Sequence, residues 1–204
     1  MTWAAFASVV LIHLAAAISP GPSFVVSVRT AASEGFGVAC ALALGFGFGA
    51  VLWATAAMAG LAVLFELVPA LFTALKLVGA GFLLFIAFLM WKHAPTPLET
   101  PGPDAQPRTN WGAVKLGFLT FASNPKPAIF FGAVFVGLVP VGTPLPWLLA
   151  ILLMVFVNET AWYIVVARVF SLPKAQAGYL HMKAVIDRTF GALIALFGLK
   201  IAFT

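Results

Sequence analysis

Charged residues are scarce in this 204-residue sequence. Only 8% of the residues are Asp, Glu, Lys or Arg, whereas a water-soluble domain carries roughly 25%. Hydrophobic residues make up 63% of the chain, and its mean hydropathy is +1.09. Too few polar side chains are present to cover a folded surface in water. This excludes the soluble globular class and predicts an integral membrane protein.

The sequence also lacks the residues on which metal and cofactor sites usually depend. The single cysteine, Cys40, excludes an intramolecular disulfide and a zinc site built from several cysteines. Three histidines, His13, His93 and His181, are scattered and do not have the spacing of metal ligands. We therefore expect no metal and no cofactor.

The composition argues against two further classes of function. The net charge of +5 comes from 11 basic residues that form no continuous stripe, so nucleic acid is not expected as a partner. Ser23 follows Gly21-Pro22, but the nearest histidine, His13, lies ten residues earlier on the same predicted helix. Because no nucleophile–base or metal constellation is found, we predict that the protein is not an enzyme.

Long charge-free runs determine the predicted spans. Residues 1–28, 35–65 and 127–158 contain no charged side chain, and a bilayer core of ~30 Å needs ~20 apolar residues in a helix. The runs are too long and too rich in Ala, Leu and Gly for the alternation of a barrel. Residues 1–8 contain no Lys or Arg that could form the basic start of a signal peptide, so we expect a retained helix there. We predict an all-α protein with six transmembrane helices, at 3–27, 36–65, 69–91, 112–137, 146–169 and 185–203.

The basic residues predict the orientation. Eight of them lie in or near the links after the first, third and fifth helices: Arg29, Lys92, Arg108, Lys115, Arg168, Lys174, Lys183 and Arg188. On the opposite side we count only Lys76 and Lys200. Because cytoplasmic loops carry the excess of Lys and Arg, we expect both termini to be periplasmic.

One linker divides the chain into two halves. Residues 93–110 contain five prolines and three charged residues, so this segment is predicted to be a cytoplasmic linker outside the membrane. Residues 1–92 and 111–204 then form two repeats of three helices each. Because three is an odd number of spans, the second repeat must be inverted relative to the first.

The two halves share an irregularity in their first helix. Ser19-Pro20-Gly21-Pro22 interrupts the first predicted helix, and Asn124-Pro125-Lys126-Pro127 interrupts the fourth. Proline removes a backbone donor, so each motif breaks its helix and frees carbonyl groups. Such groups are tolerated at membrane depth only where they face protein or a water-filled cavity. Matched breaks in an inverted repeat indicate a transporter site near the midplane, where the two motifs should approach each other; the alternative is two packing kinks.

These motifs resemble a known family. Ile18-Ser19-Pro20-Gly21-Pro22, the glycines of the second predicted helix, and Asn124-Pro125-Lys126 followed by Ala128-Ile129-Phe130-Phe131 resemble the lysine exporter family of bacterial amino-acid effluxers, especially its homoserine/threonine branch. The resemblance covers the whole chain in order and length. It implies export of amino acids or their derivatives across the bacterial inner membrane, coupled to protons.

Two charged residues lie inside apolar runs, where charge is costly. Lys126 sits within the second break and could bind a substrate carboxylate, or could extend its ammonium to the membrane surface. Asn158 and Glu159 lie midway along the fifth predicted helix. Glu159 could bind a substrate ammonium or a coupled proton, or could neutralise Lys126 in a purely structural pair. The candidate substrate-binding and translocation residues are Pro20, Gly21, Pro22, Asn124, Pro125, Lys126, Asn158 and Glu159.

Glycines mark one face of the second predicted helix. Gly45 and Gly49 are four residues apart, so they share a face that would let another helix approach closely. Gly45-x-Gly47-x-Gly49 is not a nucleotide fingerprint, because no βαβ unit surrounds it. The same face could serve a homodimer. Two alternatives to the amino-acid exporter stay open at this point: a cation or metal exporter of related architecture, and a membrane assembly subunit.

Overall fold

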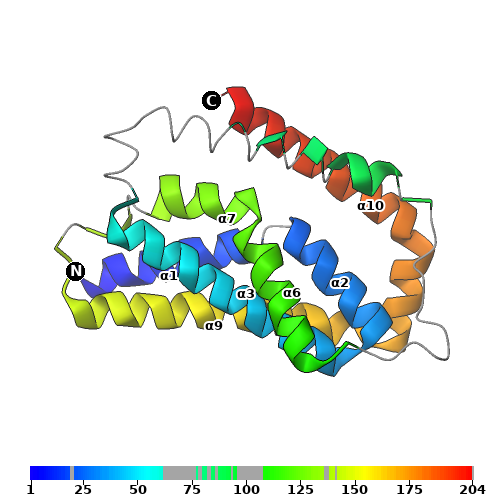
Figure 1. Ribbon diagram of the computed structural model, residues 1–204, viewed down its shortest axis with the longest axis horizontal. Helices are drawn as coiled ribbons and strands as arrows, with labels where there is room; N and C mark the ends of the chain where they lie inside the picture. The colour runs from blue at the N-terminus through cyan, green and yellow to red at the C-terminus, as the bar shows by residue number, and fades with distance from the viewer. Residues whose placement is uncertain are drawn as a thin grey trace.

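The computed structural model describes residues 1–18, 21–61, 77, 80–81, 84–85, 87–92, 94–95, 108–135, 138–140 and 142–203. Within these residues every regular element is a helix and no strand occurs, so the all-α prediction is confirmed (Figure 1). The elements are α1 (Trp3–Ile18), α2 (Pro22–Glu34), α3 (Phe36–Ala56), η1 (Ala57–Leu61), α6 (Asn110–Ala122), α7 (Pro125–Ile129), η2 (Phe130–Phe135), α9 (Leu145–Phe170) and α10 (Pro173–Phe203).

Two described helices are long and apolar enough to cross a membrane, and they match two predicted spans. They cover Phe36–Gly60 and Leu145–Phe170, where we predicted helices at 36–65 and 146–169. A third is added if α1 and α2, which are bent by 61° relative to each other, form one broken span. The predicted helix at 69–91, the linker at 93–110 and Lys76 lie largely or wholly outside the described residues. The six-span inverted repeat therefore stays a prediction.

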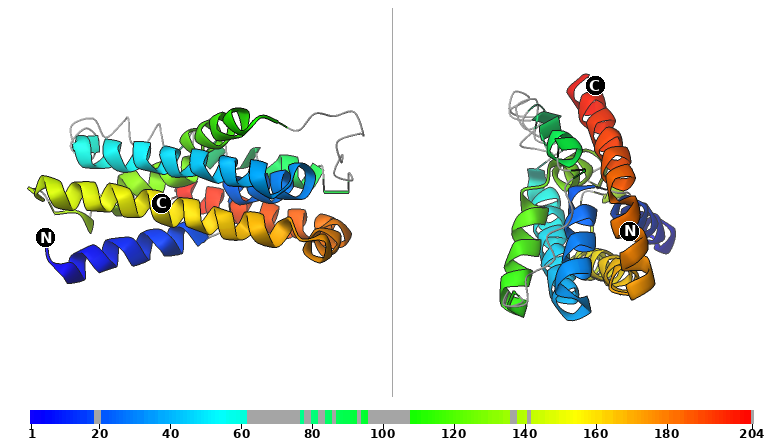
Figure 2. Two further views of the ribbon diagram at one scale, coloured as in Figure 1. Left: turned by 90° about the horizontal axis from the view of Figure 1, so that it is seen from below. Right: turned by 90° about the vertical axis from the view of Figure 1, so that its right-hand side faces the viewer.

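Helix α3 lies at the centre of the bundle, between α6 and α9 (Figure 2). A Cβ atom on Gly45 would clash with the α6 backbone at Val114 and Phe118. A Cβ atom on Gly47 would meet Phe156 and Thr160 of α9. The close approach of α6 at Gly45 confirms the packing interpretation of the face that Gly45 shares with Gly49, and Gly47 allows a similar approach of α9 on another face.

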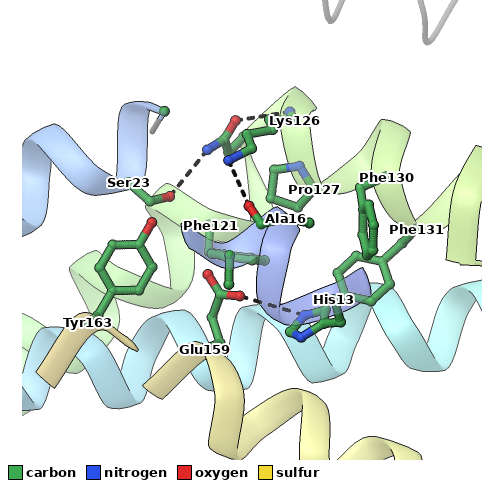
Figure 3. Close-up of a pocket in the computed structure, with 13 residues that line it drawn as sticks. His13, Ala16, Ser23, Phe121, Lys126, Pro127, Phe130, Phe131, Glu159 and Tyr163 are labelled. Atoms are coloured by element: carbon green, nitrogen blue, oxygen red, sulfur yellow. Dashed lines mark hydrogen bonds and ion pairs between the residues drawn. The ribbon is translucent and has the colours of Figure 1, made fainter. Parts of the chain in front are cut away.

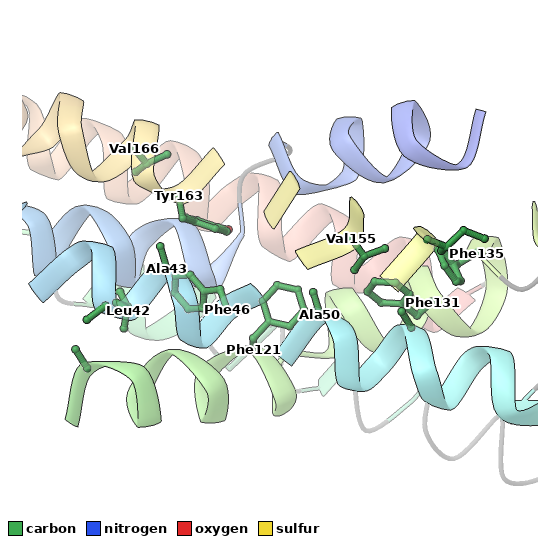
Figure 4. Close-up of a cluster of buried hydrophobic side chains, with 14 of the residues drawn as sticks. Leu42, Ala43, Phe46, Ala50, Phe121, Phe131, Phe135, Val155, Tyr163 and Val166 are labelled. Carbon is green, nitrogen blue, oxygen red and sulfur yellow. The ribbon is translucent and has the colours of Figure 1, made fainter. Parts of the chain in front are cut away.

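The apolar core fills the contacts of α3 with its neighbours. Leu42, Phe46 and Ala50 of α3 are fully buried, and the Phe46 ring packs against Tyr163 of α9 at 4.5 Å between centroids (Figure 4). Phe131 of η2 packs in the same cluster. This rigid packing supports the helix breaks that lie beside it.

Both proline motifs interrupt their helices. Helix α1 ends at Ile18, and α2 begins at Pro22, where the missing N–H of proline costs nothing. Helix α6 ends at Ala122, and α7 begins at Pro125. The side-chain oxygen of Asn124 accepts a hydrogen bond of 3.0 Å from the Lys126 N–H, which caps α7. Pro20 lies outside the described residues.

Two predicted helix boundaries are wrong. Helix α2 continues to Glu34 instead of ending near residue 27, because Thr30, Ala31 and Ala32 are buried against protein. Helix α10 begins at Pro173 instead of near residue 185. The predicted boundaries followed the apolar stretches, and a helix can extend beyond the bilayer as a polar segment.

The two ends of the bundle differ in chemistry. At one end Arg108 pairs with Glu34 at 3.7 Å, and the guanidinium of Arg168 lies 5.7 Å from the centre of the Phe36 ring. At the other end, where α1 and α9 begin, Trp3 packs on Trp147 at 4.8 Å between ring centroids. Figure 1 shows the N-terminus at this second end. The first end therefore brings together basic residues that we assigned to the cytoplasmic side.

Candidate functional site

The two helix breaks meet. The amide nitrogen of the Asn124 side chain donates a hydrogen bond of 3.2 Å to the hydroxyl of Ser23, and both residues are buried. A Cβ atom on Gly21 would lie 3.1 Å from Cδ of Lys126, so only glycine lets that side chain pass without adjustment. The expectation that the two motifs approach each other is confirmed by these contacts (Figure 3).

A small cavity with both apolar and polar walls lies at this junction. Its described walls are His13, Ala16, Ala17, Gly21, Ser23, Phe121, Asn124, Lys126, Pro127, Phe130, Phe131, Glu159 and Tyr163. The free volume is about 30 Å³, which is room for one or two water molecules. An amino acid can therefore enter only after part of the wall moves.

Lys126 reaches into the cavity from α7. Its ammonium donates a hydrogen bond of 3.0 Å to the backbone carbonyl of Ala16. In a continuous helix this carbonyl would accept from residue 20, but residue 20 is a proline and has no N–H. The first proline motif thus frees the acceptor that the lysine of the second motif binds.

Glu159 enters the cavity from α9 and faces a histidine. Its carboxylate oxygen Oε2 lies 3.6 Å from Nε2 of His13, and the two side chains are 4% and 2% exposed. The His13 ring also packs against Phe130 and Phe131, with centroids 5.9 and 5.6 Å away. Figure 3 shows Glu159 and Lys126 reaching the cavity from different elements. The two charged candidates therefore share one cavity.

The remaining candidates take different positions. The Asn158 amide donates a hydrogen bond of 3.0 Å to the Val10 carbonyl, so this residue holds α1 against α9. Pro22 and Pro125 occupy the first positions of α2 and α7. Neither Asn158 nor Pro22 is among the described residues that line the cavity. Gly21, Asn124, Lys126 and Glu159 do line it.

Three polar residues of the cavity were not among the candidates from the sequence: His13, Tyr163 and Ser23. His13 precedes Pro20 by seven residues, which is two helical turns, so the predicted helix at 3–27 places both residues on one face. Tyr163 follows Glu159 by four residues and therefore shares its face of α9. Its hydroxyl points toward Ser23 (Figure 3). These spacings were visible in the sequence and could have identified the first two residues.

The arrangement suits a small zwitterion. Lys126 offers a cation, Glu159 offers a carboxylate, and Ser23, Asn124 and Tyr163 offer neutral hydrogen-bonding groups. Within the described residues no three His, Cys, Asp or Glu side chains come together in a way that could hold a metal ion. The cavity walls thus provide hydrogen bonds and opposite charges for a ligand that carries both.

Comparison with known proteins yields one family and several relatives. The family model "LysE type translocator" matches residues 14–204. The threonine efflux protein of Escherichia coli K12 is 33% identical over 200 residues, which cover 96% of each chain. The threonine efflux protein of Salmonella typhi is 32% identical over the same shares. An uncharacterized membrane protein of Haemophilus influenzae is 30% identical over 96% of this chain and 95% of its own. No solved structure matches the chain.

Proposed function

This chain belongs to the LysE type translocator family, and on that premise we propose that it exports a small neutral amino acid from the bacterial cytoplasm in exchange for protons. The observation that carries the proposal is the cavity between the two helix breaks. Lys126 and Glu159 both line it and come from different helices. An α-amino acid carries a carboxylate and an ammonium, so one cation and one carboxylate complement it.

The cavity favours a neutral side chain on the substrate. Glu159 is the one carboxylate among the described residues of the wall. If it binds the α-ammonium, no second acidic group is available there for the charge of a basic side chain. Ser23, Asn124 and Tyr163 can instead form hydrogen bonds with a substrate hydroxyl. The relatives named as threonine efflux proteins make threonine the first substrate to test.

We further propose that six spans cross the inner membrane as an inverted repeat with both termini in the periplasm. The two repeats would be residues 1–92 and 111–204, joined by the linker at 93–110. The matched breaks at Gly21-Pro22 and Asn124-Pro125 support this arrangement. The gathering of Arg108 and Arg168 at one end of the bundle supports the orientation.

Counterflow in proteoliposomes tests the proposal. Vesicles that contain the purified protein are loaded with unlabelled threonine, and transient uptake of labelled threonine is measured. We expect counterflow with threonine and with other small neutral amino acids, and much weaker counterflow with lysine or arginine. Strong counterflow of a basic amino acid would overturn the substrate class.

If no amino acid supports counterflow, the proposed activity is wrong. Flux of a divalent cation through the same vesicles would then indicate the metal exporter. No flux of any kind would favour the assembly subunit. Vesicles without protein supply the background for all three measurements.

A further inference from the structure

We infer that His13 and Glu159 together form the proton-binding pair of this transporter, with the transported proton carried by the imidazole of His13. The inference rests on the proposed export function and assigns the coupling step to a particular residue. It starts from the short approach of His13 Nε2 to Glu159 Oε2, 3.6 Å, within a cavity that both residues line.

The position of His13 makes it a competitor of the substrate. Glu159 is the carboxylate proposed to bind the substrate ammonium, yet in the structure it already faces His13. An imidazolium and an ammonium cannot both lie beside one buried carboxylate without strong repulsion, because like charges are poorly screened away from water. When the ammonium arrives, His13 must therefore release its proton.

The two ring nitrogens of His13 have different surroundings. Nδ1 is buried and has no hydrogen-bond partner among the described residues. The hydrogen bond that one ring nitrogen of a histidine makes determines which nitrogen carries the proton. Here Glu159 lies beside Nε2, so the proton that His13 binds or releases is the one between the imidazole and this carboxylate.

The other titratable groups around His13 are few. Lys126 of α7 and Tyr163 of α9 line the same cavity. Gly21, Ser23 of α2 and the phenylalanine rings of α6 and η2 add no charge to the described wall. Lys126 contacts the Ala16 carbonyl and is proposed to bind the substrate carboxylate. Among the described residues of the wall His13 is the one imidazole, and its Nε2 faces Glu159.

In the proposed transport cycle, one proton enters the cytoplasm for each substrate molecule that is exported. A proton from the periplasm binds to His13 and neutralises Glu159 while the cavity holds no substrate. Entry of the amino acid from the cytoplasm places its ammonium on Glu159, and the proton leaves His13 for cytoplasmic water. Because His13 lies on α1, which Asn158 also holds to α9 through Val10, loss of the His13–Glu159 contact leaves α1 with fewer links to α9.

The test compares His13→Gln with wild type in two assays on the same proteoliposomes. Glutamine keeps a donor for Glu159 but does not titrate in this range. With the membrane potential clamped at zero and the lumen more acidic by one pH unit, the wild type should accumulate threonine up to about tenfold, the limit for one proton per substrate. His13→Gln should equilibrate threonine without accumulating it, and its counterflow shows whether the variant still binds and moves threonine. The exposed His181 gives the matched control, and His181→Gln should behave as the wild type.

Each outcome decides a different point. If the wild type shows no counterflow, the export proposal fails. If the wild type shows counterflow but no gradient-driven accumulation, export stands and this inference is wrong. If His13→Gln accumulates threonine, the inference is wrong because another group carries the proton, and Glu159 is then the first residue to test. If folded His13→Gln loses counterflow too, the residue acts in substrate binding or positioning and the inference is again overturned.

A measurement on the wild type covers the case in which His13→Gln cannot be purified. Threonine is added to the protein in a weakly buffered detergent solution with a pH indicator. We expect release of about one proton per bound threonine, because the free and the bound site differ in their proton occupancy. Binding without proton release at any pH from about 5 to 8, the range in which histidine titrates, would overturn the inference.

Discussion

Asn124 donates a hydrogen bond from its side-chain amide to the hydroxyl of Ser23, which lies 101 residues earlier, at 3.2 Å. The oxygen of the same amide accepts from the Lys126 N–H and starts helix α7. One side chain therefore both defines the second helix break and joins it to the first. Because Ser23 and Asn124 are buried, loss of either contact leaves a buried polar group without its protein partner.

Removing either partner should destabilise the junction, and the stability losses of the two single variants should not be additive in the double variant. Asn124→Ala loses a helix cap, worth about 1 kcal/mol, and also the bond to Ser23, worth another ~1 kcal/mol. Ser23→Ala loses only the second contact and leaves a buried N–H group unsatisfied. We expect both variants to lower the thermal unfolding midpoint in detergent, Asn124→Ala more strongly.

In the double variant Ser23→Ala should have little further effect, because its partner is already absent. Ser8→Ala is the control, since the exposed Ser8 hydroxyl bonds only to the Ala4 carbonyl of its own helix. Additive losses in the double variant would show that the two residues act independently.

Lys126→Ala and Glu159→Gln should each abolish export while the protein still inserts and folds. Loss of a buried charged contact costs roughly 2 kcal/mol or more, so the rate of threonine export should fall at least about 30-fold. Export from whole cells and counterflow in vesicles measure the effect. Lys115→Ala is the control, because Lys115 lies over Trp111 at the surface of α6, away from the cavity.

A normal rate in either variant from pH 6 to 8 would remove that residue from the mechanism. If both single variants fail to fold and the double variant recovers, Lys126 and Glu159 are a structural pair. The substrate site would then lie elsewhere.

Gly45→Ala should destabilise the protein because α3 and α6 are already in contact at this point. The added methyl group would meet the α6 backbone at Val114 and Phe118, which cannot move aside as a flexible side chain could. Overpacking of this kind costs about 1–3 kcal/mol. Gly37→Ala on the same helix has open space around it and should be neutral or slightly stabilising. Equal unfolding midpoints for the two variants would contradict the close packing of α3 on α6.

Asp187→Asn should destabilise the end of the bundle where α2 meets α10. Asp187 is 1% exposed and pairs with Lys183 at 2.8 Å and with Arg29 at 3.5 Å. Breaking a buried pair by removing one partner costs about 3–5 kcal/mol, because a buried charge loses its compensation. The double variant Lys183→Gln, Asp187→Asn should recover part of the unfolding midpoint. If it unfolds below Asp187→Asn, the loss does not come from an uncompensated lysine.

Reporter fusions should locate both termini in the periplasm. Alkaline phosphatase fused to the C-terminus should be active, and a fluorescent protein that folds only in the cytoplasm should be dark there. The same reporters placed after Arg108 should give the opposite pattern. Since Arg108 and Arg168 lie at one end of the bundle, a cytoplasmic C-terminus would contradict the charge count and the inverted repeat together.

The sequence alone determined those features that depend on the free-energy cost of placing a particular residue in a particular segment. Scarce charge makes lipid the solvent of most of the surface, and two proline motifs break their helices wherever they stand, since proline lacks the donor. A charge within an apolar run needs a polar neighbour, so Lys126 and Glu159 could be identified without any coordinates. The family resemblance, which the comparisons confirm, rests on the same motifs.

The tertiary structure decided which polar groups face each other. Asn158 and Glu159 are adjacent and were equivalent candidates, but successive residues of a helix point about 100° apart. Glu159 therefore enters the cavity, while Asn158 binds the Val10 carbonyl. His13 lies far from Glu159 in the sequence and becomes its partner only because α1 packs on α9. Sequence spacing fixes the direction of a side chain on its own helix, and only helix packing determines what that side chain meets.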